Sequence, residues 1–257
     1  MRMRSGWILA AAITVVLTAI SPGVSFAAAE ISSNAGHFVA GPFATTTLVS
    51  SSNWAGYAAL GSTGTVTKVS GTWVEPKISC SSGKTTDVAT WVGIDGYSSN
   101  DLVQTGASGD CNAGSSSYYA WWEVLPSPET TISGFTVHSG DKITATVTYS
   151  TTTHKFTMTI KDGTQSFSKT KSVSGTYRDS AECIVERDTV GGTLNHLSKF
   201  KTDSFSSCTA TIGGTSGGIG SFATVSQIDM YNGSTAVALT GSLASNTSFT
   251  VTWKSYG

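Results

Sequence analysis

The chain has 257 residues, and only 12% of them are charged, about half of the share of roughly 25% that is usual in soluble proteins. The formal net charge is −1 at pH 7 and no basic cluster stands out, so nothing indicates a nucleic-acid partner. This length is sufficient for one all-β domain with a sizeable core, and the abundance of Gly, Ser and Thr favours a secreted β protein.

Residues 1–29 have the order of a secretory signal peptide. Arg2 and Arg4 come first, an apolar run follows at residues 8–20, and small residues suited to signal cleavage lie at residues 25–29. The apolar run is shorter than the roughly 20 residues that a membrane-spanning helix needs, although a retained anchor is the alternative. Cleavage would leave 13 basic and 16 acidic residues, hence a net charge of −3. We therefore expect a secreted, extracellular protein with no membrane attachment once the signal is removed.

Residues 30–48 are polar and small and have no sustained period. We interpret them as a linker or a short pro-segment. A single domain is then expected over residues 49–257, because strand-like segments and turn residues alternate from residue 49 onward.

Short strands dominate this domain. The predicted strands are residues 66–74, 88–94, 117–124, 142–150, 154–160, 226–231, 234–239 and 247–253. A tight hairpin is expected at Asp162–Gly163, and no long segment has a helical period. Many short strands at regular spacing predict one all-β domain, either a sandwich or a barrel.

The four cysteines all lie in the exported part of the chain. They are Cys80, Cys111, Cys183 and Cys208. An even count in an oxidising compartment favours two disulfides, and of the three possible pairings we favour the sequence-local one, Cys80–Cys111 with Cys183–Cys208. No Cys/His cluster has zinc-site spacing, so we expect no metal.

Residues 181–188, AECIVERD, look like a core strand that carries two acids. Alternate residues of a strand share a face, which places Glu182 and Glu186 on the side of Ile184 and Cys183 on the opposite side. Four strand residues span about 13 Å between Cα atoms. This separation is too large for the paired carboxylates of a glycosidase.

Familiar hydrolase motifs are absent or out of context. Residues 214–218 match G-x-S-x-G in letters, but the pattern of residues 219–231 indicates turn and strand instead of the helix that this motif needs. No HExxH, Asp-Thr-Gly or Asp-Ser-Gly is present, which argues against zincins and aspartic proteases. We therefore interpret residues 214–218 as a Gly-rich loop.

Aromatic residues suggest a groove for sugars or peptides. The candidates are Trp54, Trp73, Trp91, Trp121 and Trp122, with Tyr118 and Tyr119. Each tryptophan by itself is more often a core residue, but neighbours in a strand face opposite sides. One member of the pair Trp121 and Trp122 therefore points away from the core. Asp95, Gln104 and Glu123 are individually explained as a turn residue, a hydrogen-bonded filler and a rim charge.

Seven segments in the same order resemble one known family. They are SSNWAGY (51–57), GTWVEP (71–76), TWVGIDG (90–96), LVQTG (102–106), YYAWWEVLP (118–126), HSGDKI (138–143) and AECIVER (181–187). Together they resemble the glutamic peptidases, or eqolisins, which are secreted acid endopeptidases known from fungi, with bacterial relatives. Seven ordered segments are far more specific than any single motif in this chain.

The resemblance implies a fold and a site. The family fold is an antiparallel β-sandwich of two long sheets, similar in shape to concanavalin-like lectins and glucanases. Its catalytic pair, one Gln and one Glu, matches Gln104 and Glu186. Its substrate cleft draws on positions that match Trp54, Trp91, Asp95, Trp121 and Glu123. We accordingly expect a monomeric peptidase that acts on polypeptides without a cofactor.

The chain departs from the family pattern at two places. Cys183 stands where the family has Trp in AEWIVE, and Ala107-Ser108 follows QTG where the family often has Val-Asp. The first change leaves the acid on the opposite strand face untouched. The second alters hydrogen bonding near Gln104.

A Gln and a Glu can together hydrolyse a peptide bond. The ionised Glu186 would act as general base on a water and then as acid to the leaving nitrogen, while Gln104 would position the water and stabilise the oxyanion. Because the reference pKa of Glu is about 4.3, the expected enzyme is active in acid. The alternative is a carbohydrate-binding β-sandwich without catalysis, which explains the aromatic residues and the secretion but not the Gln–Glu pair.

Overall fold

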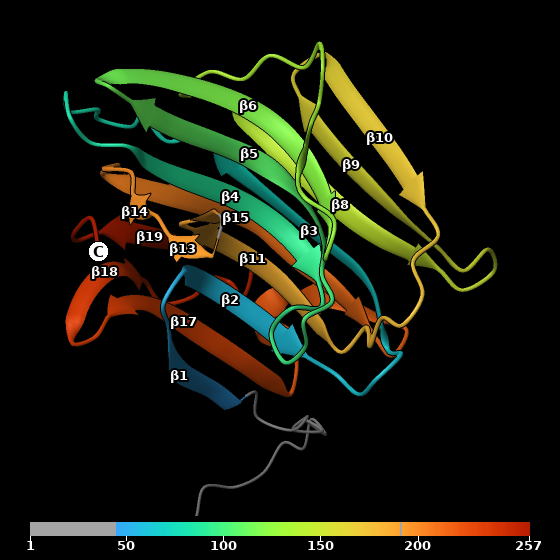
Figure 1. Ribbon diagram of the computed structural model, residues 1–257. Coiled ribbons are helices and arrows are strands. Elements are labelled where there is room, and N and C mark those ends of the chain that lie inside the picture. Colours follow the sequence, from blue (N-terminus) through green and yellow to red (C-terminus); the bar gives the residue numbers. More distant parts are fainter. Residues whose placement is uncertain (1–44, 191) are drawn as a thin grey trace, which may run out of the picture. The chain divides into compact units, whose positions relative to one another are not determined.

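The computed structural model describes residues 45–190 and 192–257, almost entirely as β-strands (Figure 1). The expected signal peptide, residues 1–29, lies outside the described residues, as do residues 30–44 of the expected linker. Residues 45–48 belong to the first strand, which begins four residues before the expected start of the domain. Their side chains are all exposed, so no alternation of polar and apolar residues marks this strand in the sequence.

The strands named from the sequence all correspond to observed strands, but several observed strands were not predicted. In chain order the elements are β1 (Thr45–Ser51), β2 (Trp54–Leu60), β3 (Val66–Val74), β4 (Thr86–Ile94), β5 (Val103–Asn112), β6 (Ser115–Val124), β7 (Thr130–Thr131), β8 (Lys142–Ser150), β9 (Lys155–Asp162), β10 (Gln165–Lys171), β11 (Ser180–Glu186), β12 (Thr189–Val190), β13 (Thr193–Leu194), β14 (His196–Leu197), β15 (Thr202–Ile212), β16 (Thr215–Gly218), the 3-10 turn η1 (Ile219–Ser221), β17 (Thr224–Asn232), β18 (Thr235–Thr240) and β19 (Phe249–Trp253). Of these, β1, β2, β5, β10 and β15 were not predicted. The predicted hairpin at Asp162–Gly163 joins β9 to β10.

Two layers of strands form a sandwich. The first layer has the order β1-β17-β2-β11-β4-β5-β6-β7, and the second has the order β18-β19-β15-β3-β8-β9-β10. The layers are joined through β18, which pairs with β17 at one end and with β19 at the other. Most neighbours are antiparallel, with β1 on β17 and β14 on β4 as parallel exceptions in the described part. The predicted antiparallel β-sandwich is confirmed.

The core lies between the layers and is built by alternation along each strand. Tyr57 and Val92 from the first layer are buried with Trp73 and Phe205 from the second. The ring centroids of Trp73 and Phe205 are 5.7 Å apart, and Phe205 stacks on Phe249 at 4.9 Å. Each such buried side chain contributes about 1.5–3 kcal/mol, so this layer of rings is a main source of stability.

Two disulfides have the sequence-local pairing favoured above. Cys80 is bonded to Cys111, and Cys183 on β11 is bonded to Cys208 on β15. The second bond crosses the core, because β11 and β15 belong to different layers. Cys183 therefore fixes β11 from its inner face, and Glu182 and Glu186 extend from the outer face.

The Gly-rich segment at residues 214–218 belongs to a hairpin and is not a loop, because Gly214 lies in the turn and Thr215–Gly218 form β16. Ile212 on β15 pairs with Thr215 on β16, and Gly213 and Gly214 between them have φ of +59° and +79°. Two successive residues with positive φ are what a two-residue hairpin turn requires, and glycine adopts them without strain. The nucleophile-elbow interpretation is excluded, because η1 after β16 is only three residues long.

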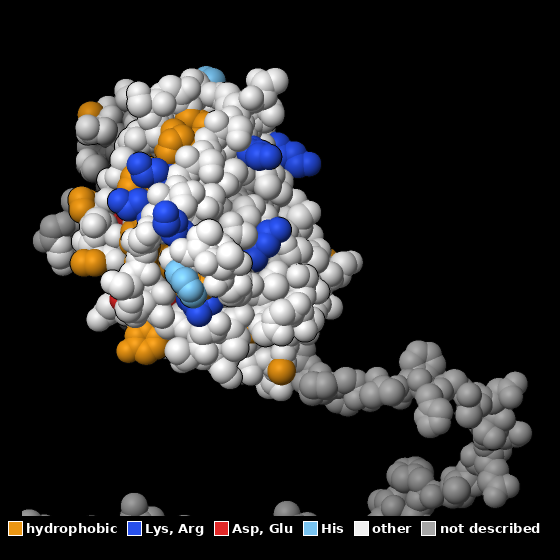
Figure 2. Space-filling model, turned by 90° about the vertical axis from the view of Figure 1, so that its right-hand side faces the viewer, with side chains coloured by type: hydrophobic (Ala, Val, Ile, Leu, Met, Phe, Trp, Pro, Cys, Tyr) orange, Lys and Arg blue, Asp and Glu red, His pale blue; other side chains and the backbone are white. Residues whose placement is uncertain are grey.

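Basic side chains lie over aromatic rings on the surface. The contacts are Lys84 with Tyr256, Lys169 and Lys171 with Trp122, Arg178 with Tyr149, and Lys199 with Trp253, at 3.9–5.6 Å from the ring centroids. Figure 2 shows several Lys and Arg side chains on one face, where acidic side chains are scarce. Within residues 45–190 and 192–257 the one ion pair joins His138 and Asp141, so no described Lys or Arg is paired with a carboxylate.

We expect the double substitution Cys183→Ala with Cys208→Ala to lower the free energy of unfolding by about 3 kcal/mol. The bond closes a loop with a sequence separation of 25 residues, and its loss enlarges the conformational entropy of the unfolded chain. Urea denaturation at pH 4, followed by tryptophan fluorescence, measures the change. An unchanged free energy of unfolding would show that the layers are held together without this bond.

Candidate active site

The outer face of the first layer carries the residues singled out in the sequence. Residues that pair directly across neighbouring strands point to the same face of a sheet. One row of such pairs runs through Ser226, Ala58, Glu182, Gly93, Gln104 and Glu123. A second row runs through Trp54, Glu186, Ala89, Ser108 and Tyr119. Glu182, Gln104 and Glu186 therefore share one face.

Small residues make room on this face for large side chains. Trp91 on β4 and Trp121 on β6 both pair with Gly106, which lies on β5 between them. A Cβ atom at Gly106 would collide with the carbonyl oxygen of Thr90 and with the Trp91 side chain. Glycine at this position therefore allows the indole of Trp91 to lie against the sheet.

Glu186 ends β11 with its carboxylate held by two N–H donors. Asn53 Nδ2 donates to Oε1 at 2.6 Å, and Trp91 Nε1 donates to Oε2 at 2.8 Å. Trp54, which pairs with Glu186 across β2, has a buried indole N–H without a partner of good hydrogen-bond geometry among the described residues. Asn53 directly precedes β2 and Trp91 lies on β4, so the chain segments on both sides of β11 supply the two donors.

The environment shifts the ionisation of Glu186. Burial raises its pKa to about 7, although the surrounding N–H donors favour the charged form and oppose the shift. The Glu123 carboxylate adds to the increase by repulsion. A carboxyl group with this pKa is largely protonated at pH 5 and half ionised near neutral pH.

The side-chain amide of Gln104 on β5 is hydrogen-bonded through its nitrogen and not, within the described part of the chain, through its oxygen. Its Nε2 donates to Glu123 Oε2 at 2.6 Å, whereas its buried Oε1 has no partner among the described residues. Only 4% of the residue is exposed. A primary amide has two N–H groups and one acceptor oxygen, so Gln104 keeps an acceptor and a second donor available for a bound molecule.

Both candidates line one cavity of about 590 Å³. The lining residues are Asn53, Trp54, Leu102, Gln104, Tyr119, Trp121, Glu123, Leu125, Pro128, Glu129, Glu186, Asp188 and Thr189. The structure thus brings together Gln104, Glu186, Trp54, Trp121 and Glu123. Trp91 belongs to the same site through its hydrogen bond to Glu186.

Asp95 lies apart from this cavity. It follows β4 with a φ of +73°, is fully buried, and accepts a hydrogen bond from the Asp179 backbone N–H at 3.0 Å. Its neighbour in space is Glu182, whose buried carboxylate has no partner among the described residues and whose pKa burial raises well above the usual value. Both acids therefore lie beneath the surface and not in the cavity wall.

The adjacent residues Trp121 and Trp122 on β6 face opposite sides of the sheet, as predicted from the alternation of side chains along a strand. Trp121 faces the cavity, and its Nε1 donates to Ser108 Oγ at 2.8 Å. Trp122 packs against the core between the layers, with Lys169 and Lys171 over its ring. The residue pointing away from the core is thus Trp121.

Several lining residues were not predicted from the sequence. Asn53 lies within the quoted segment SSNWAGY, but nothing in the letters marks it as a partner of Glu186. Glu129 and Asp188 lie in loops after β6 and β11, where no strand period indicates which way a side chain points. Burial raises the pKa of Glu129 to about 7 and that of Asp188 to about 9, and neighbouring carboxylates add to both increases.

The cavity concentrates carboxyl groups without a cation. Glu123, Glu129, Glu186 and Asp188 line it, and no Lys or Arg of the described part of the chain is among the lining residues. Like charges this close cannot all be ionised in a partly desolvated site. At acidic pH the protonated members can donate hydrogen bonds, and the site becomes a polar cavity of low net charge.

A protein-family model identifies the chain. The model of the peptidase A4 family matches residues 52–253, which include Gln104, Glu186 and every strand from β2 to β19. The chain belongs to the peptidase A4 family. This family comprises the glutamic peptidases, or eqolisins, so the protein is a glutamic endopeptidase and its substrates are polypeptides.

Individual glutamic peptidases are also similar to this A4 peptidase in sequence and structure. Aspergillopepsin-2 from Aspergillus niger is 32% identical over 227 residues, which are 79% of this chain and 78% of that protein. A crystal structure of scytalido-glutamic peptidase with a peptide-based transition-state analog has a TM-score of 0.66 at 26% identity, over 79% of this chain and 98% of that one. Aspergilloglutamic peptidase from Aspergillus niger has a TM-score of 0.58 at 31% identity, over 65% and 99% of the two chains.

We expect Asn53→Ala to move the pKa of Glu186 upward by about one, because the substitution removes a hydrogen bond to the charged form. Carbon-13 NMR of a glutamate-labelled protein, titrated from pH 4 to 9, measures this. Asn232→Ala, which removes an exposed amide from the end of β17, is the matched control and leaves the value unchanged. An unchanged Glu186 pKa in Asn53→Ala would show that this hydrogen bond does not control its ionisation.

We also expect the fold to be most stable in acid. Burial raises the pKa of Glu75 to about 8 and that of Asp203 to about 7. The contribution of the two groups to the free energy of unfolding is therefore fully present below about pH 4, where their pKa values lie in the unfolded chain. It is lost as the pH rises through 7 and 8. The melting temperature should fall by about 10 °C or more between pH 4 and 8.

Circular dichroism at a series of pH values measures this dependence. Glu75→Gln keeps an acceptor for Trp73 Nε1, which donates to Glu75 Oε2 at 3.0 Å, and should flatten the decline. A melting temperature that is constant or that rises from pH 4 to 8 contradicts the expectation.

Proposed function

We propose that this A4 peptidase cleaves polypeptides outside the cell with Glu186 and Gln104 as its catalytic pair. The observation that carries the proposal is their arrangement: far apart in the sequence, they line the same cavity and point from the same face of the sheet. Glu186 is surrounded by N–H donors, and Gln104 has an unpartnered acceptor oxygen. This combination suits a base beside a group that orients water.

The proposed reaction uses both groups twice. Glu186 accepts a proton from a water held by Gln104 Oε1 while the water oxygen bonds to the carbonyl carbon of the substrate. The second Nε2–H of Gln104, the one not engaged by Glu123, hydrogen-bonds the oxyanion that forms. The C–N bond then breaks, Glu186 returns the proton to the leaving nitrogen, and a carboxylic acid and an amine are released.

The raised pKa of Glu186 moves the expected pH range upward. With the reference pKa of about 4.3 the base would be ionised at pH 5, but with a pKa of about 7 roughly one molecule in a hundred is. The ionised fraction therefore increases from pH 4 to 7, while the stability of the fold decreases over the same interval. We propose an optimum in mildly acidic solution, near pH 5–6, instead of pH 3–4.

Export from the cell is part of the proposal. Two disulfides are typical of proteins that fold in an oxidising compartment, and residues 1–29 have the pattern of a signal peptide. In residues 45–190 and 192–257 no helix is long and apolar enough to span a membrane.

We expect Gln104→Ala and Glu186→Gln each to lower the rate of casein digestion at least about 100-fold, because each removes a group that acts in the transition state. The assay is run at pH 4, 5 and 6 with EDTA and pepstatin present, and thermal melting verifies folding. Gln165→Ala on β10, in the other layer, is the control and retains full activity.

Three outcomes would overturn parts of this proposal. Full activity in Glu186→Gln removes Glu186 from the mechanism. If the wild-type rate is highest at pH 3 and declines through pH 5, the protonated form of Glu186 is the active form. Glu186 then does not act first as a general base. No digestion anywhere from pH 2 to 6 favours the carbohydrate-binding alternative.

A further inference from the structure

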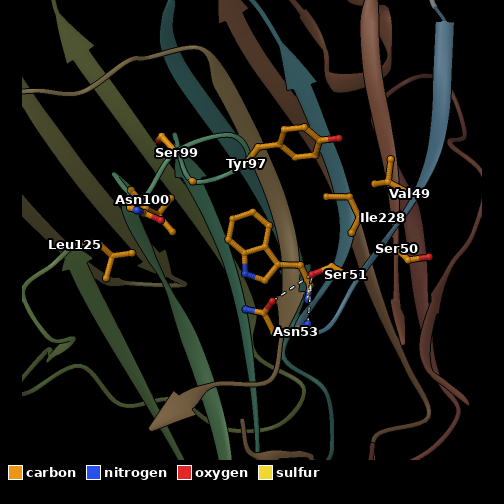
Figure 3. A pocket seen from close by; sticks show the side chains of 12 residues that line it. Val49, Ser50, Ser51, Asn53, Tyr97, Ser99, Asn100, Leu125 and Ile228 are labelled. Atoms are coloured by element: carbon orange, nitrogen blue, oxygen red, sulfur yellow. Dashed lines mark hydrogen bonds between the residues drawn. The ribbon is translucent and has the colours of Figure 1, made fainter. Parts of the chain in front are cut away.

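A second hollow of about 600 Å³ adjoins the catalytic cavity (Figure 3). Asn53, Trp54, Leu102 and Leu125 line both spaces, so the two are parts of one cleft. Val49 on β1 and Ile228 on β17 lie on one side of the second hollow, and Asn100 and Leu125 lie on the opposite side (Figure 3). This second hollow is called the neutral pocket below.

The two parts of the cleft differ in chemistry. Among the described residues, no charged side chain lines the neutral pocket, whereas four carboxyl groups line the catalytic cavity. Its apolar surface comes from Val49, Leu102, Leu125, Ile228 and the rings of Trp54 and Tyr97. Its polar groups are uncharged hydroxyls and amides. A charged side chain placed there would lose hydration without gaining a counter-charge.

The walls of the neutral pocket are fixed by the fold. The Tyr97 hydroxyl forms a hydrogen bond with Ser226 Oγ at 2.8 Å, which ties the loop after β4 to β17. Gly96, with a φ of +101°, lets this loop approach Trp54, since a Cβ atom there would lie 3.0 Å from Trp54 Cη2. On the other side, Ile228 is 2% exposed and lies on β17 between β1 and β2.

We propose that the neutral pocket is a specificity subsite that binds a large apolar side chain of the polypeptide substrate, at least two residues from the scissile bond. The inference rests on the proposed function, because it places the scissile bond at Glu186 and Gln104. An extended peptide advances about 3.3 Å per residue, so a chain that crosses the catalytic cavity passes the shared wall of Trp54 and Leu102 within a few residues. The continuity of the cleft makes the substrate the natural occupant of the pocket.

The subsite also determines the direction in which a peptide binds along the cleft. A substrate with an apolar residue on the side of the neutral pocket places its other end beside Glu129 and Asp188. The reverse orientation puts the apolar residue against carboxyl groups. Selection at the neutral pocket therefore determines which of two antiparallel binding modes brings a peptide bond to Glu186.

The test is a library of internally quenched peptides built on one cleaved casein sequence and varied at one position at a time. We expect wild-type kcat/KM to be at least about tenfold higher for Phe or Leu than for Lys or Asp at one position outside the two that flank the scissile bond. In the double variant Val49→Asp with Asn100→Asp, the ratio of kcat/KM for Phe or Leu to that for Lys should fall at least tenfold at pH 5.5. The largest increase in kcat/KM is expected for the Lys peptides.

The control and the second variant keep the test decisive. Leu48→Asp introduces the same charge on β1, at a side chain that is 64% exposed and does not line the cleft, and leaves the preference unchanged. If the double variant does not fold, Ser99→Trp, which fills the pocket, should instead shift the preference from Phe to Ala.

Each result identifies which statement fails. Cleavage that requires Gln104 and Glu186 but shows no apolar preference beyond the flanking positions overturns the subsite alone. The same holds for a preference that the pocket variants leave unchanged. Absence of any cleavage, or full activity without Gln104 and Glu186, overturns the proposed function itself.

Discussion

The position of β11 determines the rest of the site. This strand is hydrogen-bonded along both edges, to β2 and to β4, and its inner face is bonded through Cys183 to the other layer. A slip of one residue would turn Glu186 into the core and bring Val185 to the cleft, so the register is strongly constrained. Because the same two neighbours carry Asn53 and Trp91, the pairing that holds the strand also places the donors around its terminal carboxylate.

The distribution of charge follows from this arrangement. Acidic side chains such as Glu75, Glu182 and Asp203 are buried, and several basic ones lie outside against rings. Arg187 is an exception, because it is buried and donates to the Ser52 carbonyl oxygen. In the cleft, carboxyl groups gather at the catalytic end and are absent from the lining of the other end. One chain thereby combines a cavity whose charge changes with pH with an adjoining hollow whose described lining side chains are uncharged.

Part of the fold is encoded locally, because a period of two and turn residues mark strands such as β8 and β9 directly, whereas β2, β5 and β15 were not recognised. The alternation in β11 also placed Glu182 and Glu186 on one face. Only the resemblance to the glutamic peptidases selected Glu186 of the two as the catalytic candidate. Long-range features could not be predicted in this way. The role of Asn53 depends on where β2 starts relative to β11, and the pKa of Glu186 depends on what covers it. β1 escaped prediction because its exposed threonines carry no pattern.

Contacts of surface cations with rings instead of carboxylates have a consequence for stability in acid. A carboxylate partner loses its charge as the pH falls through about 4, so a surface held by ion pairs loosens in strongly acidic solution. Indole and phenol rings keep their electron-rich faces at any such pH. The contacts of Lys169 and Lys171 with Trp122 therefore persist unchanged, and the outer strand β10 stays attached where an ion-paired edge would fray.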